Sequence, residues 1–322
     1  MSKPNNQSHW AGIDERGSAV GMKILFFVYR VLGRYLLWIP LFPVVFYLYL
    51  SGKTGRVESQ RFLSQVNAYN GKKKKASFWQ GLKLFCSFAN SAFDKIDAWL
   101  GKITLEHIKY GGDSEFSTIV ENKKGAILIG SHLGNLEVCR ALSDGRYNSP
   151  INVLTFTQNA AKFNRVLQSV NNRVNVNLIE ISDMSPGLAI SLKEKVDNGE
   201  IIVIVGDRTS VSASGRVNYA DFLGKPAAFA QGPFILASVL ECPVYWLFCL
   251  KEQGRYNVIF EHVADKIEMP RKRREQVLQH IIDSYAQRLS YYANLYPYQW
   301  FNFFNFWQKD EQVSRESKRS QQ

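Results

Sequence analysis

From about residue 100 onward, short apolar runs alternate with longer segments whose apolar residues recur every three or four positions. Short runs bounded by turn residues predict buried strands, and the longer spacing predicts helices that bury one face. The predicted strands are 103–108, 126–130, 151–157, 176–181, 201–205, 243–250 and 256–262. The predicted helices are 136–142, 160–171, 186–198, 227–241 and 271–294. Strands separated by helices predict an α/β fold, in which a mostly parallel sheet is flanked by helices on both faces.

One helix boundary is written clearly in the sequence. Ser185 has the side chain of an N-cap and Pro186 suits the first helical position, while Gly199 follows the last residue of the apolar pattern. A capping hydroxyl, a proline at N1 and a glycine past the end are the ordinary start and stop signals of a helix. They predict a helix over 186–198.

The chain before residue 100 has a helical pattern throughout. Apolar residues recur at helical spacing over 77–100, and residues 35–50 form an uncharged run of sixteen. As a straight helix that run would extend roughly 24 Å, short of the ~30 Å hydrocarbon core of a bilayer. Pro40 and Pro43 lie within it and predict a break or kink. We expect a helix or kinked pair lying in the cytoplasmic leaflet of a membrane, with a buried helix of a soluble protein as the alternative.

These patterns divide the chain into four parts. A polar N-terminal tail covers 1–22, a membrane-associated helical region covers 23–100, an α/β domain covers 101–309, and a second polar tail covers 310–322. A lysine run at 72–75 follows the apolar region and is either a solvated loop or a patch that faces lipid headgroups.

Charge indicates the kind of partner. Forty Lys and Arg against 28 Asp and Glu give a net charge of +12, which favours anionic partners. Nucleic acid, anionic lipid headgroups and phosphorylated carriers all qualify, and charge alone does not choose among them. The four cysteines show neither a Cys-x-x-Cys pair nor zinc-ligand spacing, so we predict no metal site and a reducing compartment.

The candidate chemistry begins with His132 and Glu137 in the stretch Gly130-Ser-His-Leu-Gly-Asn-Leu-Glu-Val138. The histidine follows a predicted strand and precedes a predicted helix. Ligands of open α/β folds bind at the carboxyl ends of the strands. Two residues five apart point different ways on one helix, but they can meet across a loop-to-helix junction. A carboxylate on one imidazole nitrogen leaves the other free to take a proton from a hydroxyl.

Other polar residues follow neighbouring strands. Asp207 and Arg208 come after strand 201–205, and Asn164 and Arg165 come soon after strand 151–157. In a parallel sheet these residues would converge with His132 on one rim. The alternative for Asp207 and Arg208 is a local ion pair that closes a turn.

Several motifs together resemble a known family. The His-x4-Glu block is similar to that of the lysophospholipid acyltransferase superfamily, and the ordered set is similar to its bacterial branch of lipid A late acyltransferases. The matching segments are His9-Trp10 with Glu15-Arg-Gly-Ser18, Gly130–Glu137, Val205-Gly-Asp-Arg208, Phe222-Leu-Gly-Lys-Pro-Ala227, Gln231-Gly-Pro233 and Gln299–Trp307. The resemblance covers about residues 9 to 307, with Glu137 where many members carry Asp.

The resemblance implies a reaction. His132 would be the general base and Glu137 its orienting carboxylate in an acyltransferase domain over 101–309. The substrate would contact residues of the matching blocks and the nearby polar set, namely Asn135, Asn164, Arg165, Asp207, Arg208 and Lys225. The enzyme would move a fatty acyl chain from acyl carrier protein or a coenzyme A thioester, as co-substrate, to a hydroxyl or amine of a lipid or glycolipid. It would need no other cofactor, because a thioester already has a good leaving group.

The expected partners are membrane lipids and the acyl thioester, at the cytoplasmic face of the bacterial inner membrane and without nucleic acid. Two other classes remain as alternatives. A nucleic-acid-binding protein would fit the charge, the lysine run and Arg271–Arg274, although the aromatic residues gather in apolar runs instead of among the basic ones. A metallohydrolase would use His132 and Glu137 as ligands and needs further ligands nearby.

Overall fold

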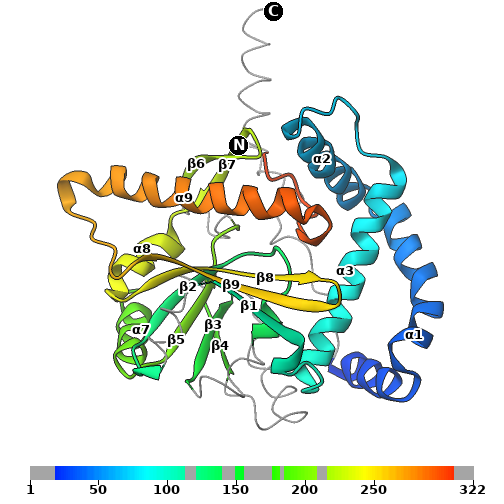
Figure 1. The fold of residues 1–322 in the computed structure, drawn as a ribbon, viewed down its shortest axis with the longest axis horizontal. Coiled ribbons are helices and arrows are strands. Elements are labelled where there is room, and N and C mark those ends of the chain that lie inside the picture. Colours follow the sequence, from blue (N-terminus) through cyan, green and yellow to red (C-terminus); the bar gives the residue numbers. More distant parts are fainter. Residues whose placement is uncertain are drawn as a thin grey trace, which may run out of the picture.

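A computed structural model describes residues 19–112, 121–139, 149–155, 176–181, 185–208 and 216–307. Its centre is a seven-stranded sheet in the order β1-β9-β8-β2-β5-β3-β4 (Figure 1). The strands are β1 (Ile108–Gly112), β2 (Ala126–Gly130), β3 (Ile151–Thr155), β4 (Val176–Glu180), β5 (Ile201–Val205), β8 (Val244–Glu252) and β9 (Arg255–Ala264). Every neighbouring pair is parallel except β8 and β9, so the predicted mostly parallel sheet is confirmed.

Both faces of the sheet are buried. Along β2, Ile127 and Ile129 belong to one hydrophobic cluster and Ala126 and Leu128 to another on the opposite face. A central parallel strand has no solvent side, which is why β2 and β5 are continuous apolar runs. The α/β fold class predicted from these runs is therefore confirmed.

Helices and a small hairpin surround the sheet. The α-helices are α1 (Ala19–Ser51), α2 (Lys53–Tyr69), α3 (Phe78–Trp99), α7 (Pro186–Asp197), α8 (Gly232–Leu240) and α9 (Arg274–Leu295). Helix α9 crosses one face of the sheet, and α1, α2 and α3 lie together beyond one end of β8 and β9 (Figure 1). As predicted, Ser185 caps α7 and Pro186 opens it: the Ser185 hydroxyl accepts a hydrogen bond from the Leu188 N–H.

Helix 227–241 was predicted too long, because its first part is a strand. Residues Lys225–Ala230 form β7, which pairs antiparallel with β6 (Val217–Phe222), and the helix begins only at Gly232. The hairpin turn consists of Leu223 and Gly224, with φ of 53° and 78°. Positive φ at both positions is the type I′ geometry, for which Asn-Gly is the usual sequence signal. The turn was not predicted because its first position carries a leucine instead of Asn or Gly.

Two other predicted boundaries differ. Strand 103–108 lies later, at β1, and a 3-10 turn, η3 (Leu105–His107), precedes it. The helix predicted over 136–142 is a 3-10 turn, η4 (Leu136–Cys139), as far as the described residues go. The helix predicted over 160–171 lies outside the described residues, as do the polar tails except for residues 19–22.

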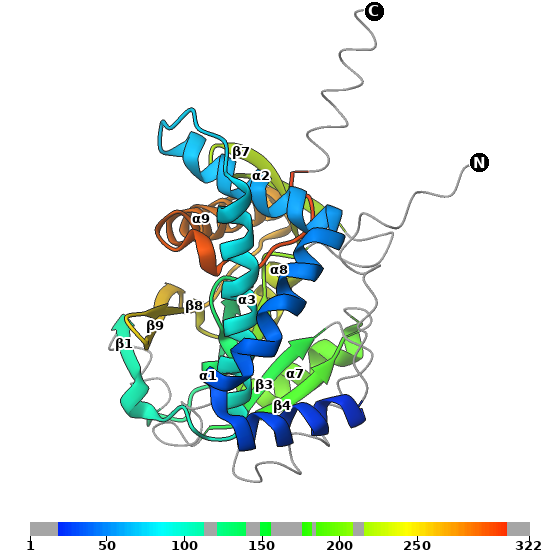
Figure 2. The same ribbon diagram turned by 90° about the vertical axis from the view of Figure 1, so that its right-hand side faces the viewer.

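The helical N-terminal region forms a layer of its own beside the sheet. Helix α1 lies alongside α3, away from the sheet (Figure 2). The kink in α1 lies at Gly33, which has non-helical φ 70° and ψ 173°. The helix continues through Pro40 and Pro43, where the sequence predicted a break or kink. Within the described chain, no single helix is long and apolar enough to span a bilayer. One pair, Leu36–Ser51 and Lys53–Tyr69 with an 88° bend between them, reaches the required length and composition.

Candidate active site

The carboxyl ends of β2 and β5 form the site. The two strands pair in register up to Gly130 and Val205, and the Gly206 N–H then donates to the Gly130 carbonyl at 2.9 Å. The chain beyond each strand therefore leaves the sheet at the same point. His132 follows β2 and Asp207 follows β5, so the predicted convergence on one rim is confirmed for this pair.

Close backbone packing fixes the loop that carries His132. Gly134 has φ +79°, and a Cβ there would lie 1.9 Å from the Cys249 carbonyl oxygen of β8. Only glycine combines that dihedral with that approach. The Asn135 N–H donates to the same carbonyl at 2.9 Å, which ties the loop to the sheet. The position of His132 is thus set by main-chain contacts on both sides of it.

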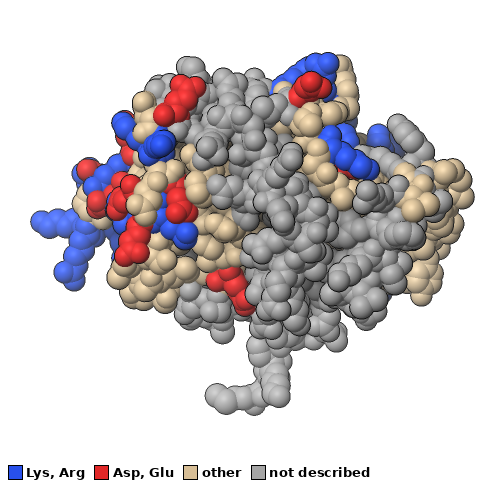
Figure 3. Space-filling model, turned by 90° about the horizontal axis from the view of Figure 1, so that it is seen from below, with Lys and Arg blue, Asp and Glu red and all other residues tan. Residues whose placement is uncertain are grey.

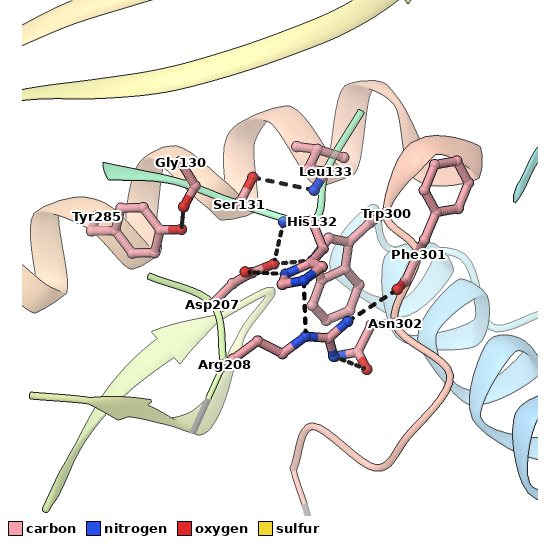
Figure 4. A network of polar contacts seen from close by, with 10 residues as sticks. All are labelled: Gly130, Ser131, His132, Leu133, Asp207, Arg208, Tyr285, Trp300, Phe301 and Asn302. Atoms are coloured by element: carbon pink, nitrogen blue, oxygen red, sulfur yellow. Dashed lines mark hydrogen bonds and ion pairs between the residues drawn. The ribbon is translucent and has the colours of Figure 1, made fainter. Parts of the chain in front are cut away.

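The Asp207 carboxylate holds His132 in place (Figure 4). Its Oδ1 lies 2.8 Å from the imidazole Nδ1, and its Oδ2 accepts the His132 backbone N–H at 2.8 Å and the Trp300 indole N–H at 3.2 Å. An ionised carboxylate only accepts hydrogen bonds, so Nδ1 carries the proton and Nε2 presents its lone pair. The Asp207 side chain is 1% exposed and that of His132 is 38% exposed. Nε2, the basic nitrogen, therefore belongs to the more exposed side chain of the pair, that of His132.

The titration of both groups follows from this geometry. Burial raises the pKa of Asp207, but the charge and hydrogen bonds of His132, together with Arg208, outweigh it and hold this pKa at about 2. Desolvation and then the Arg208 guanidinium lower the pKa of His132, and the Asp207 carboxylate opposes them. Near neutral pH the pair is thus a carboxylate beside a neutral imidazole, the state that a general base requires.

Arg208 lies on the other side of the imidazole (Figure 4). Its Nε is 3.5 Å from His132 Nε2, and its two terminal nitrogens donate to the Asn302 side-chain oxygen and the Phe301 carbonyl at 3.3 and 3.4 Å. The guanidinium also packs 4.7 Å from the centre of the Phe304 ring. The Arg208 Nε–H thus donates a long hydrogen bond to Nε2 and places a positive charge next to the basic nitrogen.

Residues Gln299–Asn302 also belong to the site, although sequence alone indicated them only through the resemblance to the family. Gln299 pairs with the backbone of Lys251 in β8, accepting its N–H and donating to its carbonyl, both at 2.8 Å. The Gln299 carbonyl then accepts the Gly134 N–H at 2.8 Å, and the Phe301 N–H donates to the His132 carbonyl at 3.3 Å. A glutamine followed by a tryptophan has no periodicity signal, so only tertiary contacts reveal this role.

The other predicted catalytic residue, Glu137, lies in η4, where its backbone N–H donates to the Asn135 side-chain oxygen at 3.2 Å. The carboxylate on Nδ1 of His132, the place expected for Glu137, belongs to Asp207. Asn135 is 4% exposed, and its amide also donates to the Ser91 carbonyl of α3 at 3.3 Å. Asn135 thus joins the loop to α3. A catalytic role for Glu137 and a substrate contact for Asn135 stay predictions.

Of the remaining predicted residues, only Lys225 is described, and it is not at the imidazole. Lys225 is exposed beside the turn of the β6–β7 hairpin, in the smaller sheet. Asn164 and Arg165 lie outside the described residues. Among the residues that are described, no group of three or more His, Cys, Asp or Glu is arranged to hold a metal ion.

A buried carboxylate, an accessible neutral imidazole and an adjacent guanidinium at the rim of a parallel sheet are typical of an enzyme that removes a proton from its substrate. A search of curated proteins finds no match to this chain. Residues 80–309 match the family described as bacterial lipid A biosynthesis acyltransferase, and the chain belongs to that family. The resemblance drawn from the motifs is therefore confirmed, and the chain is an acyltransferase of lipid biosynthesis.

Proposed function

We propose that this protein moves a fatty acyl chain from a thioester of acyl carrier protein or coenzyme A to a hydroxyl or amine of a lipid or glycolipid. The reaction would take place at the cytoplasmic face of the bacterial inner membrane. The observation that carries the proposal is the 2.8 Å contact between His132 Nδ1 and the buried Asp207 carboxylate, which leaves Nε2 of the part-exposed imidazole as the nitrogen that can accept a proton. Family membership supports acyl transfer to a lipid acceptor.

The chemistry needs one base and one positive charge. Nε2 of His132 takes the proton of the acceptor hydroxyl as its oxygen attacks the thioester carbonyl carbon. A carbon–oxygen bond forms, the carbon–sulfur bond breaks, and the proton passes from the imidazolium to the departing thiolate. Arg208, 3.5 Å from Nε2, supplies a positive charge beside the carbonyl oxygen while it carries negative charge. No serine or cysteine nucleophile is required.

The surface of α1 supports action at a membrane. One face of this helix is buried, partly against α3, and includes Tyr29, Leu37, Val45 and Tyr49. Another face exposes large apolar side chains, among them Leu36, Ile39, Phe42, Tyr47 and Leu50, with Ile39 71% exposed. Among the described side chains, those at the right-hand margin of Figure 3, the side on which α1 lies, are mostly uncharged. A helix that is apolar on both its buried and its exposed face suits an interfacial position in lipid.

Replacing His132 with Ala tests the proposed reaction. The donors are dodecanoyl and hexadecanoyl thioesters of carrier protein and of coenzyme A, and the acceptor is a lipid A precursor. The purified variant should react ~10²–10⁴-fold more slowly than the wild type. Thiol release and mass spectrometry of the lipid product measure the reaction. Lipid extracts from cells that express or lack the protein would reveal the natural acceptor. A folded His132→Ala variant with unchanged turnover would refute the proposal.

A further inference from the structure

Trp300 is the least expected member of the catalytic network. Its indole N–H reaches the same Asp207 oxygen that accepts the His132 backbone N–H, at 3.2 and 2.8 Å. Trp300 and Asp207 are 1% and 2% exposed. A hydrogen bond between a neutral donor and a buried carboxylate is stronger and more directional than one made in water. The indole therefore restrains the rotation of the carboxylate that orients the imidazole.

The indole ring is held from several directions. Its centre lies 4.6 Å from that of Phe62 in α2, 4.8 Å from that of Phe222 in β6 and 5.0 Å from that of Phe306. Its backbone forms a β-bridge with Leu133, the residue after the catalytic histidine. The ring and the histidine loop are consequently parts of one packed unit. A donor held this firmly keeps its direction through the reaction.

We propose that Trp300 is a positioning residue for acyl transfer, which acts by fixing the Asp207 carboxylate on His132. The inference rests on the proposed function, because it assigns a role within the same reaction. It predicts that loss of the indole N–H, with the aromatic packing kept, lowers turnover and changes the titration of His132. A tryptophan that only fills the core would have neither effect.

Trp307 offers a matched control. It belongs to the same buried aromatic cluster, stacks on Phe222 with centres 5.7 Å apart, and donates its indole N–H to the Phe222 carbonyl at 3.4 Å. It therefore loses a comparable donor and ring edge on replacement by Phe, but at an acceptor outside the catalytic network. The difference between Trp300→Phe and Trp307→Phe isolates the bond to Asp207.

The test measures kcat, KM and the pH profile of both variants in the assay described for His132→Ala. Trp300→Phe should lower kcat about tenfold with little change in KM, the loss expected for a hydrogen bond to a charged group. The carboxylate, with one donor fewer, becomes a better partner for the imidazolium, so the acid limb of the profile should move to higher pH. Trp307→Phe should match the wild type in both respects.

Equal kcat and equal acid limbs for the two variants would overturn the proposal. Retained activity in His132→Ala would instead overturn the proposed function, so the two failures are distinct. If Trp300→Phe does not fold, benzothienylalanine at position 300 keeps the ring volume and removes only the N–H. A readout without turnover is the rate at which diethyl pyrocarbonate modifies His132, followed by peptide mass spectrometry against pH. Its midpoint should rise on loss of the Trp300 donor and stay in place for Trp307→Phe.

Discussion

Replacing Asp207 with Asn should impair the enzyme far more than its small change in size suggests. The oxygen of the new amide is required at the position of Oδ2, which accepts the backbone N–H of His132 and the indole N–H of Trp300. The amide NH2 then faces Nδ1 of His132. Two donors cannot share that contact, so the imidazole must move its proton to Nε2. The nitrogen that should accept the substrate proton is then already protonated.

The pKa of Asp207 shows how strongly the site favours the charged carboxylate. Its fall from 3.8 to about 2 corresponds to roughly 2 to 3 kcal/mol in favour of the charged carboxylate, at about 1.4 kcal/mol per pKa unit. Asp207→Asn removes this charge and also selects the wrong tautomer of the base, so we expect kcat to fall by ~10²–10⁴-fold, the range for loss of one general base. Because the folded-state pKa is depressed, the corresponding stability is fully present above the unfolded value. It is lost as pH falls through about 2, and Asp207→Asn should lack it at neutral pH.

Glu137→Gln is the matched comparison, because Glu137 was the carboxylate expected on His132. Both variants are assayed for thiol release, with thermal unfolding as a check on folding. A direct orienting role for Asp207 requires Asp207→Asn to lose much more kcat than Glu137→Gln. If a folded Asp207→Asn variant kept its kcat within a few-fold while Glu137→Gln lost it, our reasoning about the imidazole partner would be wrong.

Three further outcomes are expected. First, kcat/KM should fall with decreasing pH through a midpoint below 6.5. Desolvation and Arg208 lower the pKa of His132, and only the neutral imidazole accepts a proton. A midpoint above 6.5 would contradict this. Second, Gly134→Ala should reduce the free energy of unfolding by about 2 kcal/mol or more and lower kcat, because the new Cβ would meet the Cys249 carbonyl oxygen. An unchanged denaturant midpoint would exclude this loss of stability. Third, replacing the exposed Lys72–Lys75 with Gln should weaken the salt dependence of binding to anionic liposomes and leave turnover in detergent unchanged. Unaltered liposome binding would identify these lysines as a solvated loop.

The sequence by itself determined the elements whose local pattern and tertiary environment agree. Strands β2 and β5 were predicted to the residue, because a strand buried on both faces must be apolar along its whole length. The start of α7 was equally clear from Ser185 and Pro186. The β6–β7 hairpin was missed, since Leu223 occupies a turn position that usually carries Asn or Gly and the pairing of the two strands compensates for it.

For the site, the sequence determined the edge but not the contacts. Two parallel strands in register must end at the same rim, so the meeting of His132 with Asp207 and Arg208 followed from the strand predictions. Which carboxylate takes Nδ1 depends on side-chain directions that spacing does not encode, and the fold selected Asp207. The part played by Trp300 depends on its contacts with Asp207 and Leu133, which lie roughly 90 and 170 positions earlier in the chain. Local patterns carry no information about such contacts, because they arise only when the C-terminal segment packs against the assembled sheet.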